Sequence, residues 1–417
     1  MPKNWRTYKL KEVAKLSTGF AFKSKLYENE GNLRVIRGKN VTEGYLRWGD
    51  DAKHWNHSLD KLQKYLILEN DIVIGMDGSK IGKNRALVRK LDLPAILAQR
   101  VARVQVKPEL ASQKLIWQLI NNSPFENYVE NVKTGTSIPH ISLGQVGDFE
   151  ITLPPLPEQK AIASILSALD DKIENNLAMN KTLEDMAMAL YKHWFVDFVP
   201  FQEGRFIDSE LGLIPEGWEV KLIKEVADVN SRSIKKGTAP KRITYIDIAS
   251  ANIGWVSEVE SMHFSDAPSR ARRIIDDGDI VWSTVRPNRK SRFLSLDFEK
   301  DTIVSTGFAV ISPKVVPYSY LYPHCCTDDF TDYLVSRATG SSYPAVTGKI
   351  FEQALIILPS KLILSAYDKL TKPYYQRFAS NNVENKTLTN LRDTLLPKLI
   401  SGEVRLKEFE KEITAAL

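Results

Sequence analysis

The strongest hydrophobic pattern of the chain lies in residues 155–196, where apolar positions recur every 3.5 residues. The spacing alternates between four and three residues, and after Pro157 neither glycine nor proline interrupts it. The positions of this seam are Ile162, Leu166, Leu169, Ile173, Asn176, Asn180, Leu183, Ala187, Leu190 and Trp194. Such a repeat is typical of a long helix packed along its length against another helix. At ~1.5 Å per residue, about 38 residues give a rod of roughly 57 Å.

Two seam positions are asparagines, Asn176 and Asn180, and a polar residue at a core heptad position commonly fixes register and partner. The partner is predicted later in the chain, because Asn-Lys-Thr-Leu at 180–183 recurs at 385–388 and Asn176 recurs as Asn381. The second seam consists of Tyr367, Thr371, Tyr374, Phe378, Asn381, Asn385, Leu388, Arg392, Leu395 and Leu399. Thr371 and Arg392 fit a core poorly, and Pro373 is expected to kink or start this helix. The alternative is two unrelated amphipathic helices, each buried in its own domain.

Internal repeats outside the helices indicate a duplicated unit. Trp5 with Lys-Glu-Val-Ala at 11–14 matches Trp218 with 224–227, and Asp-Ile-Val at 71–73 matches 279–281. The spacing between matched segments falls from 213 residues at the tryptophans to 205 at Leu-Pro 153–154 and 358–359, as small loop deletions would produce. The predicted organisation is a globular lobe (1–153), a long helix (154–199), a second lobe (200–360) and a second long helix with a tail (361–417).

Each lobe is expected to be mixed α/β, of the α+β type. Both tryptophans are expected in the lobe cores, and residues 200–217, rich in glycine, proline and polar residues, are expected to form a linker. One helix is predicted at 115–131. Short apolar or alternating runs predict strands at 65–74, 101–106, 151–153, 274–282 and 356–358.

Composition excludes several classes of protein. Of 417 residues, 43% are hydrophobic and 26% charged, as in ordinary globular proteins, and no apolar run reaches the length of a membrane span or forms a signal-peptide core. The chain is therefore expected in the cytoplasm. The first lobe carries 24 Lys and Arg against 16 Asp and Glu, a net charge of +8, as expected of a polyanion binder. The second carries 19 against 21, a net charge of −2, and must rely on local basic clusters.

Catalytic and metal-binding patterns do not assemble into a site. Residues 78–84 resemble a phosphate-binding loop, but the loop is one residue short and has Asn84 in place of the magnesium-binding hydroxyl. His54 and His57 have no third ligand at a suitable spacing, and the adjacent Cys325 and Cys326 cannot form a four-cysteine zinc site. No enzyme activity and no bound metal are therefore predicted.

A polar, basic loop follows the Asp-Ile-Val segment in each lobe. The first spans residues 75–85, and its candidate DNA contacts are Lys80, Lys83, Asn84 and Arg85. The second spans 283–292, and its candidates are Arg286, Asn288, Arg289, Lys290 and Arg292. Arginine and lysine can bridge guanine edges, asparagine can read adenine, and all of them can hold phosphates. Equivalent positions with different side chains suit two domains that read two different sequences, whereas the alternative is an ordinary solvated loop.

A second candidate in each lobe is a Thr-Gly loop, at 134–140 and 339–345. Small hydroxyl residues beside glycine let backbone N–H groups approach a phosphate closely. The alternative is a plain turn before the next strand. The candidate contacts are Thr136, Ser137, His140, Ser341, Ser342 and Tyr343.

Three motifs carry a resemblance to a known family. They are Leu-Pro-Pro-Leu-Pro-Glu-Gln-Lys at 153–160, Pro-Glu-Gly-Trp at 215–218 and Leu-Pro-Lys-Leu-Ile-Ser-Gly-Glu at 396–403. Together with the repeated lobes and helices, they make the whole chain resemble the DNA-specificity subunit of type I restriction-modification systems. The second helix departs from the pattern, because residues 361–363 stand where a Glu-Gln start would be expected.

The resemblance implies a non-catalytic subunit in which each target-recognition domain reads one half of a split, asymmetric DNA site. It implies that the two helices form an antiparallel coiled coil with a pseudo-two-fold relation, and that this coil sets the spacer. The implied partners are double-stranded DNA, two methyltransferase subunits and two ATP-dependent restriction subunits. S-adenosylmethionine, ATP and Mg²⁺ belong to those partners, not to this chain, and no membrane is involved. Two alternatives remain: the specificity subunit of a standalone adenine methyltransferase, and a coiled-coil scaffold without a DNA role.

Overall fold

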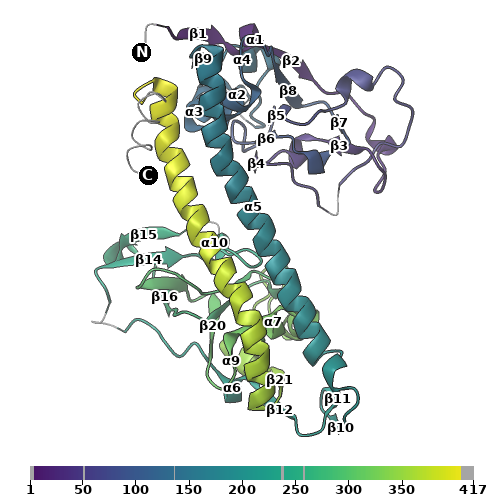
Figure 1. The fold of residues 1–417 in the computed structure, drawn as a ribbon, viewed down its shortest axis with the longest axis vertical. Coiled ribbons are helices and arrows are strands. Elements are labelled where there is room, and N and C mark those ends of the chain that lie inside the picture. Colours follow the sequence, from purple (N-terminus) through teal and green to yellow (C-terminus); the bar gives the residue numbers. More distant parts are fainter. Residues whose placement is uncertain (1–3, 50–51, 136, 236–238, 257–258, 405–417) are drawn as a thin grey trace. The chain divides into compact units, whose positions relative to one another are not determined.

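The computed structural model describes residues 4–49, 52–135, 137–235, 239–256 and 259–404. The chain divides into two compact units, Met1–Ile173 with Thr387–Leu417, and Glu174–Lys386. Two long helices, α5 (Leu156–Phe195) and α10 (Lys361–Ser401), are the teal and yellow ribbons of Figure 1. The division cuts both helices, so that each unit contains one lobe and a segment of each helix.

The first lobe is built around a five-stranded sheet of order β2-β8-β5-β6-β4. Two further strand pairs belong to this lobe. Strands β3 and β7 pair in parallel, and β1, at the start of the lobe, pairs antiparallel with β9, the strand before α5. The strands are β1 (Arg6–Lys9), β2 (Ala14–Thr18), β3 (Arg34–Ile36), β4 (Glu43–Gly44), β5 (Ile72–Gly75), β6 (Arg85–Leu87), β7 (Ala95–Leu97), β8 (Val101–Val106) and β9 (Glu150–Leu153).

The helices of the first lobe correct one prediction. The segment predicted as a single helix at 115–131 forms two helices, because the Asn122 side chain accepts a hydrogen bond from Ser123 N and Pro124 occupies the first turn of the second helix. The predicted strand at 65–74 is also shorter, since residues 63–65 form a 3₁₀ turn and β5 begins at Ile72. The helices are α1 (Leu10–Val13), α2 (Gln113–Ile120), α3 (Ser123–Val132) and α4 (Leu143–Gly147).

The second lobe has two four-stranded sheets, of order β13-β20-β17-β18 and β15-β14-β19-β16. The run predicted as one strand at 274–282 forms the end of β16 and most of β17, because the chain turns at Gly278, whose φ is +88°. The strands are β12 (Glu219–Leu222), β13 (Ala227–Val229), β14 (Arg242–Ile246), β15 (Glu260–His263), β16 (Ala271–Ile274), β17 (Ile280–Ser283), β18 (Arg292–Leu294), β19 (Thr302–Ser305), β20 (Phe308–Pro313) and β21 (Leu355–Leu358). The helices are α6 (Ile223–Val226), α7 (Tyr318–Cys326), α8 (Asp328–Ser336) and α9 (Gly348–Glu352).

The two lobes repeat one topology, as the sequence repeats predicted. The strand order β2-β8-β5-β6 of the first lobe corresponds to β13-β20-β17-β18 of the second. The parallel pair β3–β7 corresponds to β14–β19, and the closing pair β1–β9 to β12–β21. Trp5 and Trp218 are 6% and 5% exposed, which confirms their predicted place in the lobe cores.

The stretch from 200 to 217 is not a structureless linker. It folds into a 3₁₀ turn and an antiparallel hairpin of β10 (Phe206–Ser209) and β11 (Gly212–Pro215). Ser209 Oγ donates to Gly212 O at 2.6 Å and accepts from Leu211 N at 3.2 Å, which closes the two-residue turn. Gly212 has a φ of +89°, which glycine adopts readily, and it therefore suits this turn. The composition that predicted a linker here belongs to a tight hairpin.

The helices α5 and α10 present the seams predicted from the heptad pattern. Every predicted seam residue on both helices is buried or half-buried. Pro373 does not start the helix, since α10 begins at Lys361 and continues through the proline. Tyr367 and Tyr375, 0% and 5% exposed, pack into the second-lobe core on either side of Pro373 and offset the hydrogen bond that proline cannot donate.

Asparagines link the helices within the second unit. Asn176 Nδ2 donates to Asn385 Oδ1 at 2.9 Å and Asn381 Nδ2 donates to Asn180 Oδ1 at 2.8 Å, so the pairing is antiparallel. Asn180 also donates to Asn382 Oδ1 at 2.8 Å. In the first unit, Arg392 Nη1 reaches Asp170 Oδ1 at 3.1 Å.

The two poorly fitting seam residues are accommodated by polar contacts. Thr371 Oγ1 donates to Tyr367 O at 2.9 Å, within its own helix, and Arg392 is paired with Asp170. No helix among the described residues is both long enough and apolar enough to cross a membrane.

Candidate DNA interface

In each lobe the basic loop and the Thr-Gly loop are joined by backbone hydrogen bonds. In the first lobe, Gly78 N donates to Pro139 O at 3.0 Å and Ile141 N donates to Met76 O at 2.9 Å. In the second lobe, Arg286 N donates to Pro344 O at 2.7 Å and Val346 N donates to Thr284 O at 2.9 Å. These bonds connect equivalent positions, so the two loops of each lobe form one continuous surface. We call it the paired-loop surface (residues 76–84 with 134–140, and 284–291 with 339–345).

The Thr-Gly loops have the same closed base. Thr134 and His140 exchange two backbone hydrogen bonds of 2.9 and 2.8 Å, and Thr339 and Ala345 exchange two of 2.9 Å. Gly135 has a φ of +87°, and a Cβ there would lie 2.7 Å from Ile138 O, so only glycine fits without a shift. The base therefore closes the loop in the same way in each lobe.

The tips of the Thr-Gly loops expose most of their predicted contacts. The His140 side chain is exposed, and its Nε2 lies 3.0 Å from Thr134 Oγ1. Tyr343 is 68% exposed. Thr136 lies outside the described residues. The remaining exposed candidates are Ser137, Ser341 and Ser342.

The first-lobe basic loop presents two exposed lysines. Lys80 Nζ lies 2.8 Å from Glu43 Oε1, and this hydrogen bond lowers the pKa of the Glu43 carboxyl. Both partners are at least half exposed, so the pair is screened by solvent and contributes little to folding. Lys83 is exposed and Asn84 is half-buried. This surface offers two solvent-exposed ammonium groups to a polyanion.

The second-lobe basic loop is more constrained. A 3₁₀ turn at Pro287–Arg289 is flanked by two non-glycine residues in the left-handed region, Arg286 with φ of +51° and Lys290 with φ of +55°. The Arg286 guanidinium lies 4.3 Å from the centre of the Tyr343 ring and donates to Ser342 O at 3.1 Å. Asn288 and Arg289 are exposed, and Lys290 forms an ion pair with Asp328. Strained backbone of this kind is common at functional sites.

Two predicted DNA contacts, Arg85 and Arg292, are buried instead, at 5% and 8% exposure. They occupy equivalent places, since each begins the strand after its loop, opposite Ile74 on β5 or Trp282 on β17. Arg85 donates to Gly82 O and Asn121 Oδ1 and pairs with Glu126. The prediction that Arg85 contacts DNA is thereby corrected, because its guanidinium is committed inside the lobe.

Arg292 has the same arrangement with different partners. Its Nη1 donates to Lys290 O at 3.0 Å, its Nε donates to Cys326 Sγ at 2.9 Å, and the guanidinium lies 5.6 Å from the Trp282 ring centre. Each lobe therefore has a buried arginine that binds a carbonyl of its own basic loop. We infer that these two arginines hold the loops in place, and we no longer expect them to contact DNA.

One exposed basic residue was missed by the sequence. Arg100 lies in a turn with φ of +72°, and its carbonyl accepts a hydrogen bond from Met76 N at 2.9 Å, at the foot of the first-lobe loop. The second lobe has Gly307 in this role, since Thr284 N donates to Gly307 O at 2.9 Å. Only this tertiary contact placed Arg100 near the loop, because no repeat or motif marks it.

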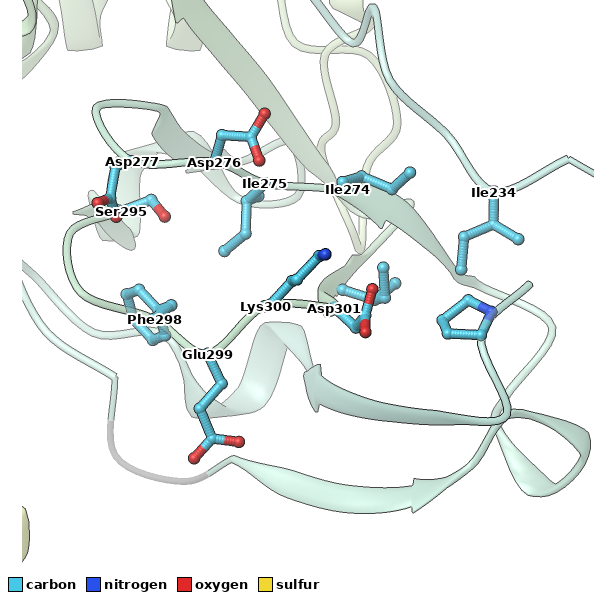
Figure 2. Close-up of a pocket in the computed structure, with 12 residues that line it drawn as sticks. Ile234, Ile274, Ile275, Asp276, Asp277, Ser295, Phe298, Glu299, Lys300 and Asp301 are labelled. Carbon is cyan, nitrogen blue, oxygen red and sulfur yellow. The ribbon is translucent and has the colours of Figure 1, made fainter. Parts of the chain in front are cut away.

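A pocket of about 480 Å³ in the second lobe is a poor DNA site. Figure 2 shows Ile274, Ile275 and Phe298 on its walls, with the carboxylates of Asp276 and Asp301 around it. Carboxylates repel phosphate, and Lys300 alone among the residues that line the pocket carries a positive charge. Among the described residues, no cluster of three or more His, Cys, Asp or Glu is arranged to hold a metal ion.

Comparison with known proteins finds a matching family model and several similar proteins. Residues 2–185 match the family model described as the type I restriction modification DNA specificity domain. The chain is 25% identical over 427 residues to the MjaIX specificity subunit of a type I restriction enzyme from Methanocaldococcus jannaschii, covering 98% of this chain and 95% of that protein. It is 31% identical over 176 residues to the EcoAI specificity subunit from Escherichia coli, covering 42% of this chain and 29% of that protein.

A solved structure supports the fold. The S subunit of a type I restriction-modification system from M. genitalium aligns with a TM-score of 0.58 and 18% identity, covering 95% of this chain and 96% of that one. Its likeness shows a shared architecture of lobes and long helices over nearly the whole chain. The matched family model, the relative aligned over nearly the whole chain, the duplicated lobes and the paired helices together make this chain similar to the specificity subunits of type I restriction-modification systems.

Proposed function

We propose that this chain is the DNA-sequence-specificity subunit of a type I restriction-modification complex, and that each lobe reads one half of a bipartite, asymmetric DNA site. The observation that carries the proposal is the paired-loop surface, which has one backbone frame in both lobes and different side chains in each. Lysines at 80 and 83 face solvent in the first lobe, and Asn288 and Arg289 in the second. Groups of these kinds hold phosphates and read base edges, so two dissimilar sets suit two dissimilar half-sites.

The proposed partners are DNA, two methyltransferase subunits and two restriction subunits. Exposed apolar side chains on the long helices support protein docking, because they lie outside the seam: Leu177, Met186, Leu370 and Val383 are 43–55% exposed. The chain itself is proposed to be non-catalytic and to bind no cofactor. S-adenosylmethionine, ATP and Mg²⁺ are proposed to act on the partner subunits.

The experiment that tests this proposal is methylome sequencing. The chain is expressed with its adjacent modification subunit in a host that lacks adenine methylation. Methylated adenines in a single split motif are expected, with both half-sites and the spacer defined at once. A complex that assembles normally but methylates no motif would favour the coiled-coil scaffold instead. Restriction of unmethylated phage, measured with and without a neighbouring restriction subunit, separates the full system from a standalone methyltransferase.

We propose further that the helices α5 and α10 set the spacer length. Their antiparallel pairing through Asn176 with Asn385 and Asn180 with Asn381 supports a fixed register. Inserting four residues at matched points of both helices, between residues 173 and 174 and between 386 and 387, is expected to lengthen the spacer and to leave both half-sites unchanged. The methylome of the variant measures both quantities. An altered half-site with an unchanged spacer would contradict this role.

A further inference from the structure

Each lobe exposes a large aromatic side chain on a tight turn beside its basic loop. Tyr45 in the first lobe is 49% exposed and Trp255 in the second is 52% exposed. Large aromatic rings are usually buried, because leaving them in water forgoes the stabilisation that burial provides. Two such rings at corresponding places are therefore unlike the scattered apolar residues of an ordinary surface.

The two turns have the same geometry. Thr42 N donates to Tyr45 O at 3.0 Å, and Asn252 N donates to Trp255 O at 2.9 Å. The residue before each ring is a glycine in the left-handed region, Gly44 with φ of +97° and Gly254 with φ of +84°. All of these equivalent residues are separated by 210 positions, so the Gly-Tyr and Gly-Trp pairs were visible in the sequence as a further repeat.

Both turns are attached to the arginine that positions the basic loop. Arg85 N donates to Thr42 O at 3.1 Å in the first lobe, and Arg292 N donates to Asn252 O at 3.0 Å in the second. Gly254 N also donates to Arg292 O at 2.8 Å, and in the first lobe Glu43 on the turn pairs with Lys80 on the loop. The turn that carries the aromatic ring thus adjoins the end of the basic loop in each lobe.

The surroundings of the rings differ between the lobes, but the aromatic character does not. Glu43 and Gly44 precede the ring in the first lobe, whereas Ile253 and Gly254 precede it in the second. An aromatic face packs on the deoxyribose of any nucleotide, while hydrogen-bonding groups must match a particular base. A contact common to two different half-sites would therefore keep the ring and vary its polar neighbours.

We infer that Tyr45 and Trp255 are equivalent DNA-contacting residues, one for each half-site, whose rings pack on the deoxyribose groups of the strand next to the paired-loop surface. This inference rests on the proposed function and adds to it a contact that carries no charge and reads no base edge. It separates two tasks in each lobe. The aromatic ring supplies sequence-independent packing, and the loop side chains supply phosphate contacts and base recognition.

The test uses Tyr45→Ala and Trp255→Ala in the complete complex with the modification subunit. The probe is a duplex that carries the motif found with the unaltered chain. Each substitution is expected to weaken binding by roughly tenfold to 100-fold, as the loss of one buried large apolar side chain would. The slope of log affinity against log salt should stay unchanged, because no charge is lost. The loss from Tyr45→Ala should be the same on a duplex whose first half-site is scrambled, because the ring contact reads no base edge.

Matched controls come from exposed apolar residues at the opposite ends of the same sheets. Leu68, 60% exposed, precedes β5, and Val315, 48% exposed, follows β20, whereas the basic loops lie at the other ends of β5 and β17. Leu68→Ala and Val315→Ala are expected to leave binding unchanged. Tyr45→Trp and Trp255→Tyr should retain most of the affinity. Thermal unfolding of every variant shows whether the fold is intact.

The outcomes separate this inference from the proposed function. If the unaltered complex binds no specific duplex, the proposed function itself fails. If the unaltered complex binds and both alanine variants bind equally well, the aromatic contact is refuted. If the variants lose the modification subunit on size-exclusion chromatography and DNA binding falls only in step with that loss, the rings contact a protein partner and the inference is likewise overturned.

Discussion

The two lobes share a backbone and differ in how that backbone is supported. Asp71 and Asp279 are equivalent buried acids at the turns before β5 and β17, and each accepts a hydrogen bond from its own turn, from Leu68 N at 2.7 Å and Asp276 N at 2.8 Å. Their cations come from different places. Asp71 pairs with Arg103 on β8, whereas Asp279 pairs with Arg232 after β13. The turn that each acid closes fixes the position of the carboxylate, whereas the arginine that pairs with it comes from a different part of the lobe in each case.

The attachment of each lobe to its long helix differs in the same manner. Gln159, 2% exposed, accepts from Ser112 N at 2.9 Å and donates to Leu110 O at 3.1 Å and Pro154 O at 2.9 Å. The equivalent residue 205 positions later is Leu364, 4% exposed in an apolar core. The Glu-Gln start expected from the resemblance is thus a polar joint in the first lobe, and an apolar joint replaces it in the second.

The largest expected effect tests whether the two acid–arginine pairs contribute equally to the stability of their lobes. Arg103→Met is expected to destabilise the first lobe by about 3–5 kcal/mol, because Arg103 and Asp71 are 7% and 6% exposed and the substitution strands a buried carboxylate. Arg232→Met should cost clearly less. The Arg232 side chain is 36% exposed, and burial already raises the pKa of Asp279, so that carboxyl can take up a proton.

Hydrogen exchange followed by mass spectrometry, read separately for β5 and β17, measures both effects. Arg100→Met, at an exposed position in the first lobe, is the control and should change little. Equal losses in the two lobes would show that solvent exposure of the cation does not decide the cost.

The second effect concerns pH and the second lobe. Burial lowers the pKa of His324 to about 4, with its Nδ1 3.1 Å from the Tyr191 hydroxyl and its Nε2 shielded from solvent. Between pH 4 and 6.5 the folded state binds fewer protons here than the unfolded state, so stability falls as the pH falls. The loss should approach about 3 kcal/mol at pH 4, at roughly 1.4 kcal/mol per pKa unit.

The measurement is the free energy of opening of the second lobe, from hydrogen exchange at pH values between 4 and 7. His324→Gln keeps a polar group near Tyr191 and removes the titration, so its profile should be flatter across this range. A variant profile parallel to that of the unaltered chain would assign the acid sensitivity to other groups.

The third effect tests the joint between lobe and helix. Gln159→Leu places the residue of the second joint in the first, and it is expected to cost about 2–3 kcal/mol because Ser112 N, Leu110 O and Pro154 O lose their partner. Gln159→Glu keeps the acceptor for Ser112 N and loses the donor, so it separates the two contributions. Exchange protection of α2 and of the first turns of α5 measures the loss. A neutral Gln159→Leu would mean that the apolar joint is interchangeable with the polar one.

The smallest expected effect tests how much a lysine of the first-lobe basic loop contributes to DNA binding. Lys83→Ala is expected to weaken DNA binding by the assembled complex severalfold and to reduce the slope of log affinity against log salt by about 1, because one phosphate contact is lost. Lys64→Ala is the control, since Lys64 is also exposed in the first lobe but lies before β5, away from the loop. Filter binding between 50 and 300 mM salt, roughly the range in which such slopes are linear, measures both. Identical slopes for Lys83→Ala and Lys64→Ala would remove Lys83 from the interface.

The sequence by itself determined the duplication, the two long helices and their antiparallel asparagine pairs. These features repeat at regular spacings, of three and four residues along each helix and of about 205 residues between the two copies. Helix periodicity follows directly from side-chain burial along one face. Trp5 and Trp218 could likewise be assigned to the cores, because large rings seldom remain in water without a use.

The tertiary structure alone decided which polar residues face solvent. Arg85 and Lys83 stand two positions apart in one basic loop, yet one is buried against Glu126 and the other is exposed, and no local pattern distinguishes them. The pairing of the basic loop with the Thr-Gly loop joins Gly78 to Pro139, and a contact between such distant positions depends on how the sheet and helices pack. Local sequence fixes backbone periodicity, whereas the fate of a charged side chain is set by the partners that the fold brings to it.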